Sequence, residues 1–196
     1  NIFCKMINIV LFGAPGAGKG TQAAKLSAKY NINHISTGEV IRDEIRRGTE
    51  MGRSVQDYIS RGELAPDSLV IGMIAQYVKS HGDCAGNIFD GFPRTTPQAE
   101  AFDVIMNENG LSVDVMLELS VPEEELVQRL LLRGKDSGRA DDADESVIRN
   151  RIDVYNAQTA VVADYYRNQN KYVAIDGMGT IDEIFGRICA EIDRLK

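Results

Sequence analysis

The chain has 196 residues, 43% of them hydrophobic, and a formal net charge of −7 at pH 7. This length and hydrophobic content are enough to bury the core of one domain. The negative charge argues against nucleic acid or a membrane surface as a partner, because either would require a broad basic face. Three scattered cysteines, Cys4, Cys84 and Cys189, favour reduced packing residues in a cytoplasmic protein over a disulfide framework or a zinc site.

Short apolar runs alternate with helical patterns along the whole chain. Met6 stands directly before the first run, and we expect it to be the natural first residue, with residues 1–5 foreign to the native chain. The alternation predicts an α/β protein of three layers, a five-stranded parallel sheet between helices, with ligands at the carboxyl ends of the strands. The expected strands are Ile7–Phe12, Asn33–Ile35, Asn87–Asp90, Val113–Leu119 and Tyr172–Ile175. The expected helices are Gly20–Tyr30, Asp67–Ser80, Pro97–Asn107, Pro122–Arg133, Ala143–Asn168 and Ile181–Leu195.

A glycine-rich segment joins the first expected strand to the first expected helix. Glycines allow successive main-chain N–H groups to turn toward an anion, and the start of the helix adds its positive dipole end. Lys19 adds a charge for the outer phosphates of a nucleoside triphosphate. The segment therefore predicts a phosphate-binding loop (P-loop), which consists of Gly13, Ala14, Pro15, Gly16, Ala17, Gly18, Lys19, Gly20 and Thr21.

The residue after Lys19 departs from the general P-loop pattern. Most P-loops have a Ser or Thr there as a magnesium ligand, whereas this chain has Gly20 and places a hydroxyl one residue later, at Thr21. We therefore expect Mg²⁺ to be held through water and phosphate, without a direct protein ligand.

Two segments interrupt the simple alternation of strands and helices. Residues 37–65 hold two short helical patterns with expected breaks at Gly48, Gly52 and Gly62. Residues 134–142 form a polar, glycine-containing stretch that we expect to be a turn between helices. Both segments are expected to be mobile appendages that close over substrates.

A second group of charged residues belongs to the same edge of the expected sheet. Asp90 ends a strand, where it could hold water around magnesium, and Arg94 follows in the same loop. The planar guanidinium group matches phosphate oxygens, so several arginines in one cleft indicate a phosphoryl group in transfer. Each arginine taken alone could equally be an ordinary surface residue. The further candidate arginines are Arg42, Arg129, Arg133, Arg139 and Arg151. Neither His34 nor His81 lies in a motif, and both are expected to be structural or surface residues.

Four motifs in this order resemble the adenylate kinase family: Gly13–Thr21, Ser36–Arg42, Asp90–Gln98 and Ser137–Asp142. The resemblance extends from Met6 to the C-terminus. It implies a core domain (residues 1–36, 67–133 and 143–196), a small helical AMP-binding domain (37–66) and a lid (134–142). It also implies the reversible reaction ATP + AMP = 2 ADP with Mg²⁺, which maintains the balance of adenine nucleotides, and a monomer in the cytoplasm.

The resemblance further implies a role for each matching residue. The catalytic set is Lys19, Asp90, Arg94, Arg133, Arg139 and Arg151. ATP would contact the P-loop and Gly179, with Arg129 stacked on its adenine and Arg133 on its phosphates. AMP would contact Thr37, Gly38, Arg42, Glu63, Leu64, Ala65, Gly91, Phe92, Pro93, Arg94, Gln98, Arg139 and Arg151, with Gln98 as the reader of its adenine. The stretch 134–138 is too short for an extended lid and has no cysteines, so we expect a short lid without structural zinc.

Three other classes of nucleotide-binding protein share parts of this sequence pattern. A pyrimidine nucleoside monophosphate kinase on the same fold is the nearest rival, and Thr37 and Gln98 favour adenine over it. A GTP-preferring relative is disfavoured by the short lid. A GTP-dependent switch protein should carry an Asn-Lys-x-Asp guanine reader, and Asn170–Val173 lacks the Asp.

Overall fold

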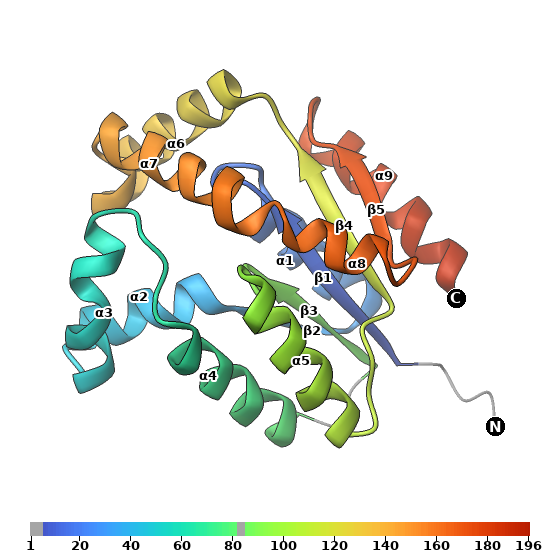
Figure 1. The fold of residues 1–196 in the computed structure, drawn as a ribbon. Coiled ribbons are helices and arrows are strands. Elements are labelled where there is room, and N and C mark those ends of the chain that lie inside the picture. The colour runs from blue at the N-terminus through green and yellow to red at the C-terminus, as the bar shows by residue number, and fades with distance from the viewer. Residues whose placement is uncertain (1–5, 82–84) are drawn as a thin grey trace.

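The computed structural model describes residues 6–81 and 85–196, so the expectations for residues 1–5, Cys4 and Cys84 lie outside the described residues. Its strands form one parallel sheet in the order β2–β3–β1–β4–β5 (Figure 1). The five-stranded parallel sheet predicted from the sequence is confirmed, with β1 at its centre. The strands are β1 (Ile7–Gly13), β2 (Asn33–Ser36), β3 (Gly86–Asp90), β4 (Val115–Ser120) and β5 (Tyr172–Asp176).

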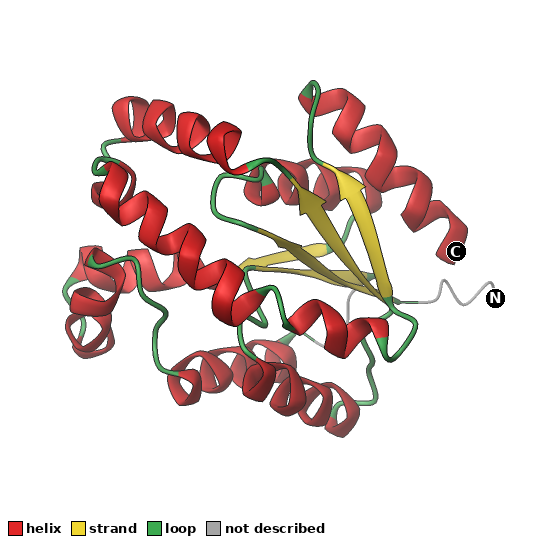
Figure 2. Ribbon diagram, turned by 45° about the horizontal axis from the view of Figure 1, so that its top comes forward, coloured by secondary structure: helices red, strands yellow, loops and turns green. Residues whose placement is uncertain are grey.

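Helices cover both faces of the sheet and complete the three layers (Figure 2). Ile9 and Leu11 of β1 belong to the core under α1 and α9, whereas Val10 and Phe12 belong to the core under α4, α5 and α8, because successive side chains of a strand point to opposite faces. The helices are α1 (Lys19–Tyr30), α2 (Thr37–Arg47), α3 (Glu50–Ser60), α4 (Asp67–Ser80), α5 (Thr96–Glu108), α6 (Glu123–Ser137), α7 (Glu145–Val154), α8 (Val162–Arg167) and α9 (Ile181–Leu195). A 3₁₀ turn (Ala140–Asp142) precedes α7, and a π-helical turn (Tyr155–Thr159) follows it.

The order of the strands decides where a ligand can bind. The P-loop follows β1, helix α2 follows β2, and Asp90 is the last residue of β3. These three strands are neighbours, and the carboxyl ends of parallel strands lie at the same edge of a sheet. Three segments that are distant in the sequence therefore meet at this edge.

Three expected boundaries are wrong. Gly52 lies inside α3, where a Cβ atom would be 2.2 Å from the carbonyl oxygen of Glu44, so this glycine allows a close crossing with α2 and does not break the helix. Residues 134–137 continue α6 as helix, so the turn begins only at Gly138. The single helix expected over 143–168 starts at Glu145 and is interrupted by the π-helical turn.

Within the part of the chain that the structure describes, none of the helices has the length and apolar character that a membrane span requires.

Candidate active site

The P-loop connects the central strand β1 to α1. Gly16 and Gly18 have φ angles of 86° and 95°, which residues with side chains rarely adopt. Gly16 also packs closely on α6, because a Cβ there would lie 2.9 Å from Cγ of Leu130. Residues 19–22, the first turn of α1, include no acidic side chain to occupy the positive end of the helix dipole. The loop thus presents the start of α1 to the ligand edge of the sheet, as an anion site requires.

Lys19 folds back over the P-loop. Its Nζ donates a hydrogen bond of 2.7 Å to the carbonyl oxygen of Gly13. Burial lowers the pKa of Lys19 from 10.5 to about 8; the charge of Asp90 opposes this shift, whereas the charges of Arg94 and Arg151 add to it. An anion bound among these cations would relieve their repulsion, so the electrostatics favour a phosphate at this place.

Arg94 lies in the segment between β3 and α5. Its Nε donates to the carbonyl oxygen of Gly91 at 2.6 Å, and the same oxygen accepts from the hydroxyl of Thr37 at 3.0 Å. Burial, together with the positive charge of Arg151, lowers the pKa of Arg94 from 12.5 to about 10. The guanidinium group is thus fixed by the main chain in a region with excess positive charge.

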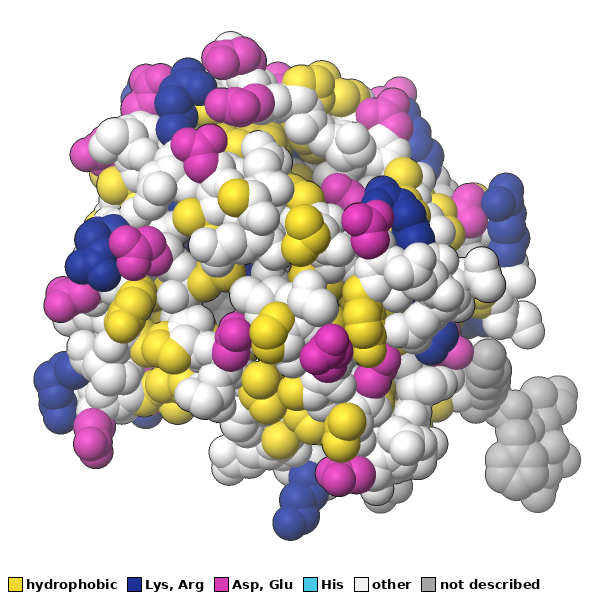
Figure 3. Space-filling view, in the orientation of Figure 1, with side chains coloured by type: hydrophobic (Ala, Val, Ile, Leu, Met, Phe, Trp, Pro, Cys, Tyr) yellow, Lys and Arg dark blue, Asp and Glu magenta, His cyan; other side chains and the backbone are white. Residues whose placement is uncertain are grey.

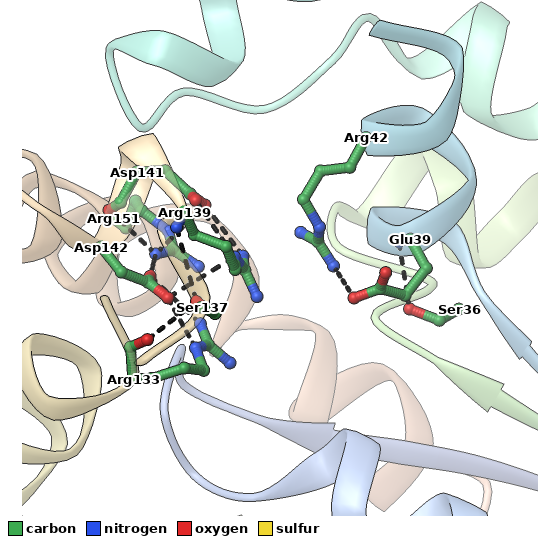
Figure 4. A network of polar contacts seen from close by, with 9 residues as sticks. All are labelled: Ser36, Glu39, Arg42, Arg133, Ser137, Arg139, Asp141, Asp142 and Arg151. Atoms are coloured by element: carbon green, nitrogen blue, oxygen red, sulfur yellow. Dashed lines mark hydrogen bonds and ion pairs between the residues drawn. The ribbon is translucent and has the colours of Figure 1, made fainter. Parts of the chain in front are cut away.

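Three more arginines meet around two aspartates (Figure 4). Asp142, whose side chain is fully buried, accepts from Nε of Arg133 at 2.6 Å and from Nη1 of Arg151 at 2.7 Å. Asp141 accepts from Nη2 of Arg139 at 2.9 Å. Burial acts to raise the pKa of Asp141, but the hydrogen bond from Arg139 and the charge of Arg151 outweigh it and hold this pKa below its ordinary value. Two carboxylates therefore hold three guanidinium groups in place without a ligand.

Arg42 projects from α2 on the opposite side of the opening from these three arginines (Figure 4). It pairs with Glu39 one turn earlier on the helix. The helix itself starts at Thr37, because the Ser36 side chain accepts the hydrogen bond of the Glu39 main-chain N–H. The capped start of α2 thus sets the direction from which Arg42 enters the site.

One cavity joins the P-loop to the start of α5. Val154, Tyr155 and Thr159 also line it, although the sequence analysis did not identify them; the π-helical turn that carries Tyr155 and Thr159 belongs to no motif that could have indicated them. The expected site residues in its lining are Gly13, Pro15, Lys19, Thr37, Gly38, Arg42, Glu63, Leu64, Ala65, Gly91, Arg94, Gln98 and Arg151.

Other expected site residues are absent from the lining of this cavity among the described residues. The Phe92 side chain lies in the core, with its ring centroid 5.1 Å from that of Phe102, so this residue could reach a ligand only through its main chain. Arg129 lies elsewhere at the same edge, where its Nη2 donates to the carbonyl oxygen of Gly177 at 3.1 Å, two residues before Gly179. The remainder are Ala14, Gly16, Ala17, Gly18, Gly20, Thr21, Asp90, Pro93, Arg133 and Arg139.

Asp90 has a partner that the sequence analysis leaves without a site role. Nε2 of His34 lies 3.2 Å from Oδ2 of Asp90. The strand register explains this contact: Ser36 of β2 is in register with Asp90 of β3, and residues two apart on a strand share a face. His34 is therefore a contact of the acid expected near magnesium, not a residue remote from the site.

The surroundings of Asp90 are compatible with Mg²⁺. A Cβ atom on Gly20 would lie 3.9 Å from Oδ2 of Asp90, at ordinary van der Waals distance, so the start of α1 lies next to this carboxylate. Mg²⁺ prefers oxygen ligands and retains several waters, and a single carboxylate beside the P-loop suits such a water-mediated contact. Across residues 6–81 and 85–196, His, Cys, Asp and Glu side chains do not gather in groups of three or more that could hold a metal ion by themselves.

A P-loop on a parallel sheet, with arginines from separate segments around one cavity, defines a P-loop enzyme of the phosphotransferase class. Comparison with known proteins agrees with this class. Residues 11–171 match the family model described as adenylate kinase. The chain therefore belongs to the adenylate kinase family.

Full-length relatives support the same assignment. An adenylate kinase of Bacteroides thetaiotaomicron is 54% identical to the chain over 190 residues, which cover 97% of the chain and 100% of the relative. An adenylate kinase of Bacteroides fragilis is 53% identical and one of Flavobacterium johnsoniae 50% identical, with the same coverage. The resemblance stated from the four sequence motifs is thus confirmed, and the protein is an enzyme of this family.

Proposed function

We propose that this chain catalyses the reversible transfer of a phosphoryl group from ATP to AMP, with two ADP as products. One observation carries the proposal: a single cavity joins the P-loop cation Lys19 to Arg42 and Arg94 and to the buried carboxamide of Gln98. Such a cavity offers positive charge for two phosphate tails and a polar reader for one base.

The proposed seat of ATP lies over the P-loop. The main chain of residues 13–21 and the ammonium group of Lys19 bind its phosphates, and Arg133 approaches them from α6. Arg129 stacks on the adenine beside the loop that contains Gly179. The contact between Arg129 and the carbonyl of Gly177 supports this arrangement, since it holds the guanidinium next to that loop.

The proposed seat of AMP lies between α2 and the start of α5. Arg42 and Arg94 bind the AMP phosphate, and Thr37 and Gln98 contact the base. Residues 63–65 line the same pocket. Arg139 and Arg151 complete the positive surroundings of the phosphoryl group in transfer.

The reaction needs alignment and charge neutralisation more than proton transfer. An oxygen of the AMP phosphate attacks the γ-phosphorus of ATP, a new P–O bond forms, and the bond between the γ-phosphorus and the β–γ bridging oxygen breaks. The attacking oxygen is already ionised, so no general base is required. Bound Mg²⁺, held through water near Asp90, would neutralise phosphate charge. Segments 37–66 and 134–142 are proposed to close on the core formed by the rest of the chain and to exclude water, which would otherwise take the phosphoryl group.

We further infer that the chain acts as a monomer in the cytoplasm. The inference about oligomeric state is supported by the cavity, since Lys19, Arg42, Arg94 and Gln98 of a single chain line it together. Light scattering of the purified protein at assay concentration tests it, and a mass of two chains would contradict it.

A nucleotide assay tests the proposed function. The purified protein is incubated with Mg²⁺, ATP and one of AMP, UMP, CMP or GMP, and formation of the diphosphates is followed. We expect AMP to be the preferred acceptor and Lys19→Met to lower turnover by about 10²–10³-fold, because a cation on the transferring phosphates is lost. Circular dichroism of Lys19→Met controls for folding. Preference for UMP or CMP would favour the pyrimidine rival, and the absence of any acceptor would overturn the proposal.

A further inference from the structure

Gln98 is held by two partners of opposite hydrogen-bonding type. Its Nε2 donates to Oδ1 of Asp67 at 2.7 Å, and its Oε1 accepts from the main-chain N–H of Arg94 at 2.8 Å. Thr95 donates from its hydroxyl to the same Asp67 oxygen at 2.9 Å. The Gln98 side chain is almost fully buried, with 1% of the residue exposed, and it lines the cavity.

These partners allow only one orientation of the carboxamide. A carboxylate offers acceptors alone, and a main-chain N–H can only donate. If the amide were flipped, its oxygen would face the Asp67 carboxylate and its NH₂ group would face the Arg94 N–H, which would leave buried polar groups unpaired. The orientation thus follows from the hydrogen-bonding chemistry of the two neighbours.

The donor and acceptor groups that Gln98 has left for a ligand are also fixed. A carboxamide has two N–H donors and two lone pairs, and Asp67 and Arg94 use one of each. One N–H and one lone pair remain for a ligand, and their order follows from the fixed orientation of the carboxamide. Adenine offers the complementary edge, an amino donor at position 6 next to the acceptor N1. Hypoxanthine and guanine offer the reverse order, a 6-oxo acceptor next to an N1–H donor.

We propose that Asp67 is a specificity-determining positioning residue, which makes the enzyme reject 6-oxopurine monophosphates by preventing Gln98 from flipping. The inference rests on the proposed function, since it assumes that Gln98 meets the base of the acceptor. It adds a residue on α4 that belongs to none of the four sequence motifs. The proposed discrimination is limited to bases with the reverse order of donor and acceptor. Cytosine has the same order as adenine, so a fixed Gln98 carboxamide does not discriminate against CMP.

Inosine monophosphate (IMP) is the probe, because it differs from AMP at the edge that Gln98 would read. We measure kcat/KM for AMP and for IMP in the wild type and in Asp67→Ala. Loss of the carboxylate should lower the AMP/IMP ratio by about tenfold or more, because a charged acceptor no longer holds Nε2 of Gln98. Asp67→Asn keeps the shape of the side chain but offers an N–H donor as well as an oxygen, so it should lower the ratio in the same direction, by less than Asp67→Ala.

A double-mutant cycle separates positioning from general damage. In a Gln98→Leu background, Asp67→Ala should leave the AMP/IMP ratio unchanged, because Asp67 acts only through the carboxamide. Asp67→Ser, which keeps a small polar residue at the start of α4 but is too short to reach Gln98, replaces Asp67→Ala if the alanine variant fails to fold. Asp182→Ala, a first-turn acid of α9 on the other face of the sheet, is the matched control and should not alter the ratio.

Two results would overturn the inference. One is an AMP/IMP ratio in Asp67→Ala that stays within about threefold of the wild-type value, as a purely structural role predicts, because both substrates would then lose activity together. The other is an equal effect of Asp67→Ala with and without Gln98. A wild type that does not phosphorylate AMP would instead overturn the proposed function, so the two failures are distinguishable.

Discussion

The protonation of Lys19 should depend on whether a nucleotide is bound in the site. Burial, with the charges of Arg94 and Arg151, brings its pKa to about 8, and a bound triphosphate would raise this pKa because it supplies negative charge. Below pH 8 the ammonium group is already protonated in the free protein. Above pH 8 it must take up a proton when the nucleotide binds.

ATP affinity should therefore be flat below about pH 8 and should fall above it by up to about tenfold per pH unit. Calorimetric titrations between pH 7 and 9.5, in buffers with different ionisation enthalpies, measure both the affinity and the proton uptake. Lys19→Arg is the control, since its guanidinium stays protonated and the pH dependence should disappear. An affinity for the wild type that is constant to pH 9.5 would contradict the assignment.

Arg94 makes a prediction that separates the two substrates. Arg94→Ala should reduce kcat/KM for AMP by about 10²–10³-fold, because a fixed guanidinium is lost from the acceptor phosphate. The KM for ATP should change little. Arg46→Ala, which removes an exposed arginine from α2, serves as the control. Steady-state kinetics with each substrate varied in turn measure both effects. A reduced kcat/KM for ATP with an unchanged kcat/KM for AMP would show that Arg94 does not bind the AMP phosphate.

At the scale of elements, Gly52 is the residue with the clearest structural consequence. A Cβ atom there would lie 2.2 Å from the Glu44 carbonyl oxygen, so Gly52→Ala must push α3 away from α2. We expect a loss of about 1–3 kcal/mol in the free energy of unfolding. Gly72→Ala in α4 is the matched control, because Gly72 is a helical glycine with no atom within 4 Å of the added Cβ. This substitution should raise the free energy of unfolding by up to about 1 kcal/mol. Thermal and urea unfolding decide, and equal stability of both variants would contradict the packing argument.

The elements also show what a sequence can and cannot predict. The strands were predictable because β1 is apolar except for Asn8 and is buried throughout, which is typical of the centre of a parallel sheet. The interruption of the last long helix pattern by a π-helical turn was not, since local periodicity does not record how a helix fits its neighbours. Gly52 was misread as a break because a glycine that ends a helix and one that allows a close crossing look the same in one sequence.

The residues of the site also divide into those that local sequence predicts and those that it does not. The P-loop is contiguous, so its residues could be predicted together from their spacing. His34 and Asp67 could not, because they meet Asp90 and Gln98 across 56 and 31 residues of chain. Such contacts depend on strand order and helix placement, which one sequence without an alignment does not specify.

At the scale of the whole molecule, the two proposed seats should respond to one ligand. A bisubstrate mimic, two adenosines joined by a chain of phosphates, should stabilise the protein by about 2.7 kcal/mol at a concentration of 100 times its Kd. Hydrogen exchange should slow in segments 37–66 and 134–142 as well as in the P-loop, because both segments close on the ligand. ATP alone should protect less of segment 37–66. Protection by the mimic that is limited to the P-loop would show that only one nucleotide is bound.

On the face of the molecule that Figure 3 shows, Lys and Arg side chains are interspersed with Asp and Glu side chains. This mixture agrees with the net charge of −7, whereas four basic residues, Lys19, Arg42, Arg94 and Arg151, line the cavity of the proposed site.

The aspartate partner of Arg133 and Arg151 has one further consequence. A guanidinium has five N–H donors, so both arginines keep donors for a phosphate while Asp142 holds them in place. The negative charge of Asp142 offsets part of their positive charge, so a phosphate gains less here than beside an unpaired cation. The same offset weakens the attraction for ADP, which favours release of two products that are both polyanions.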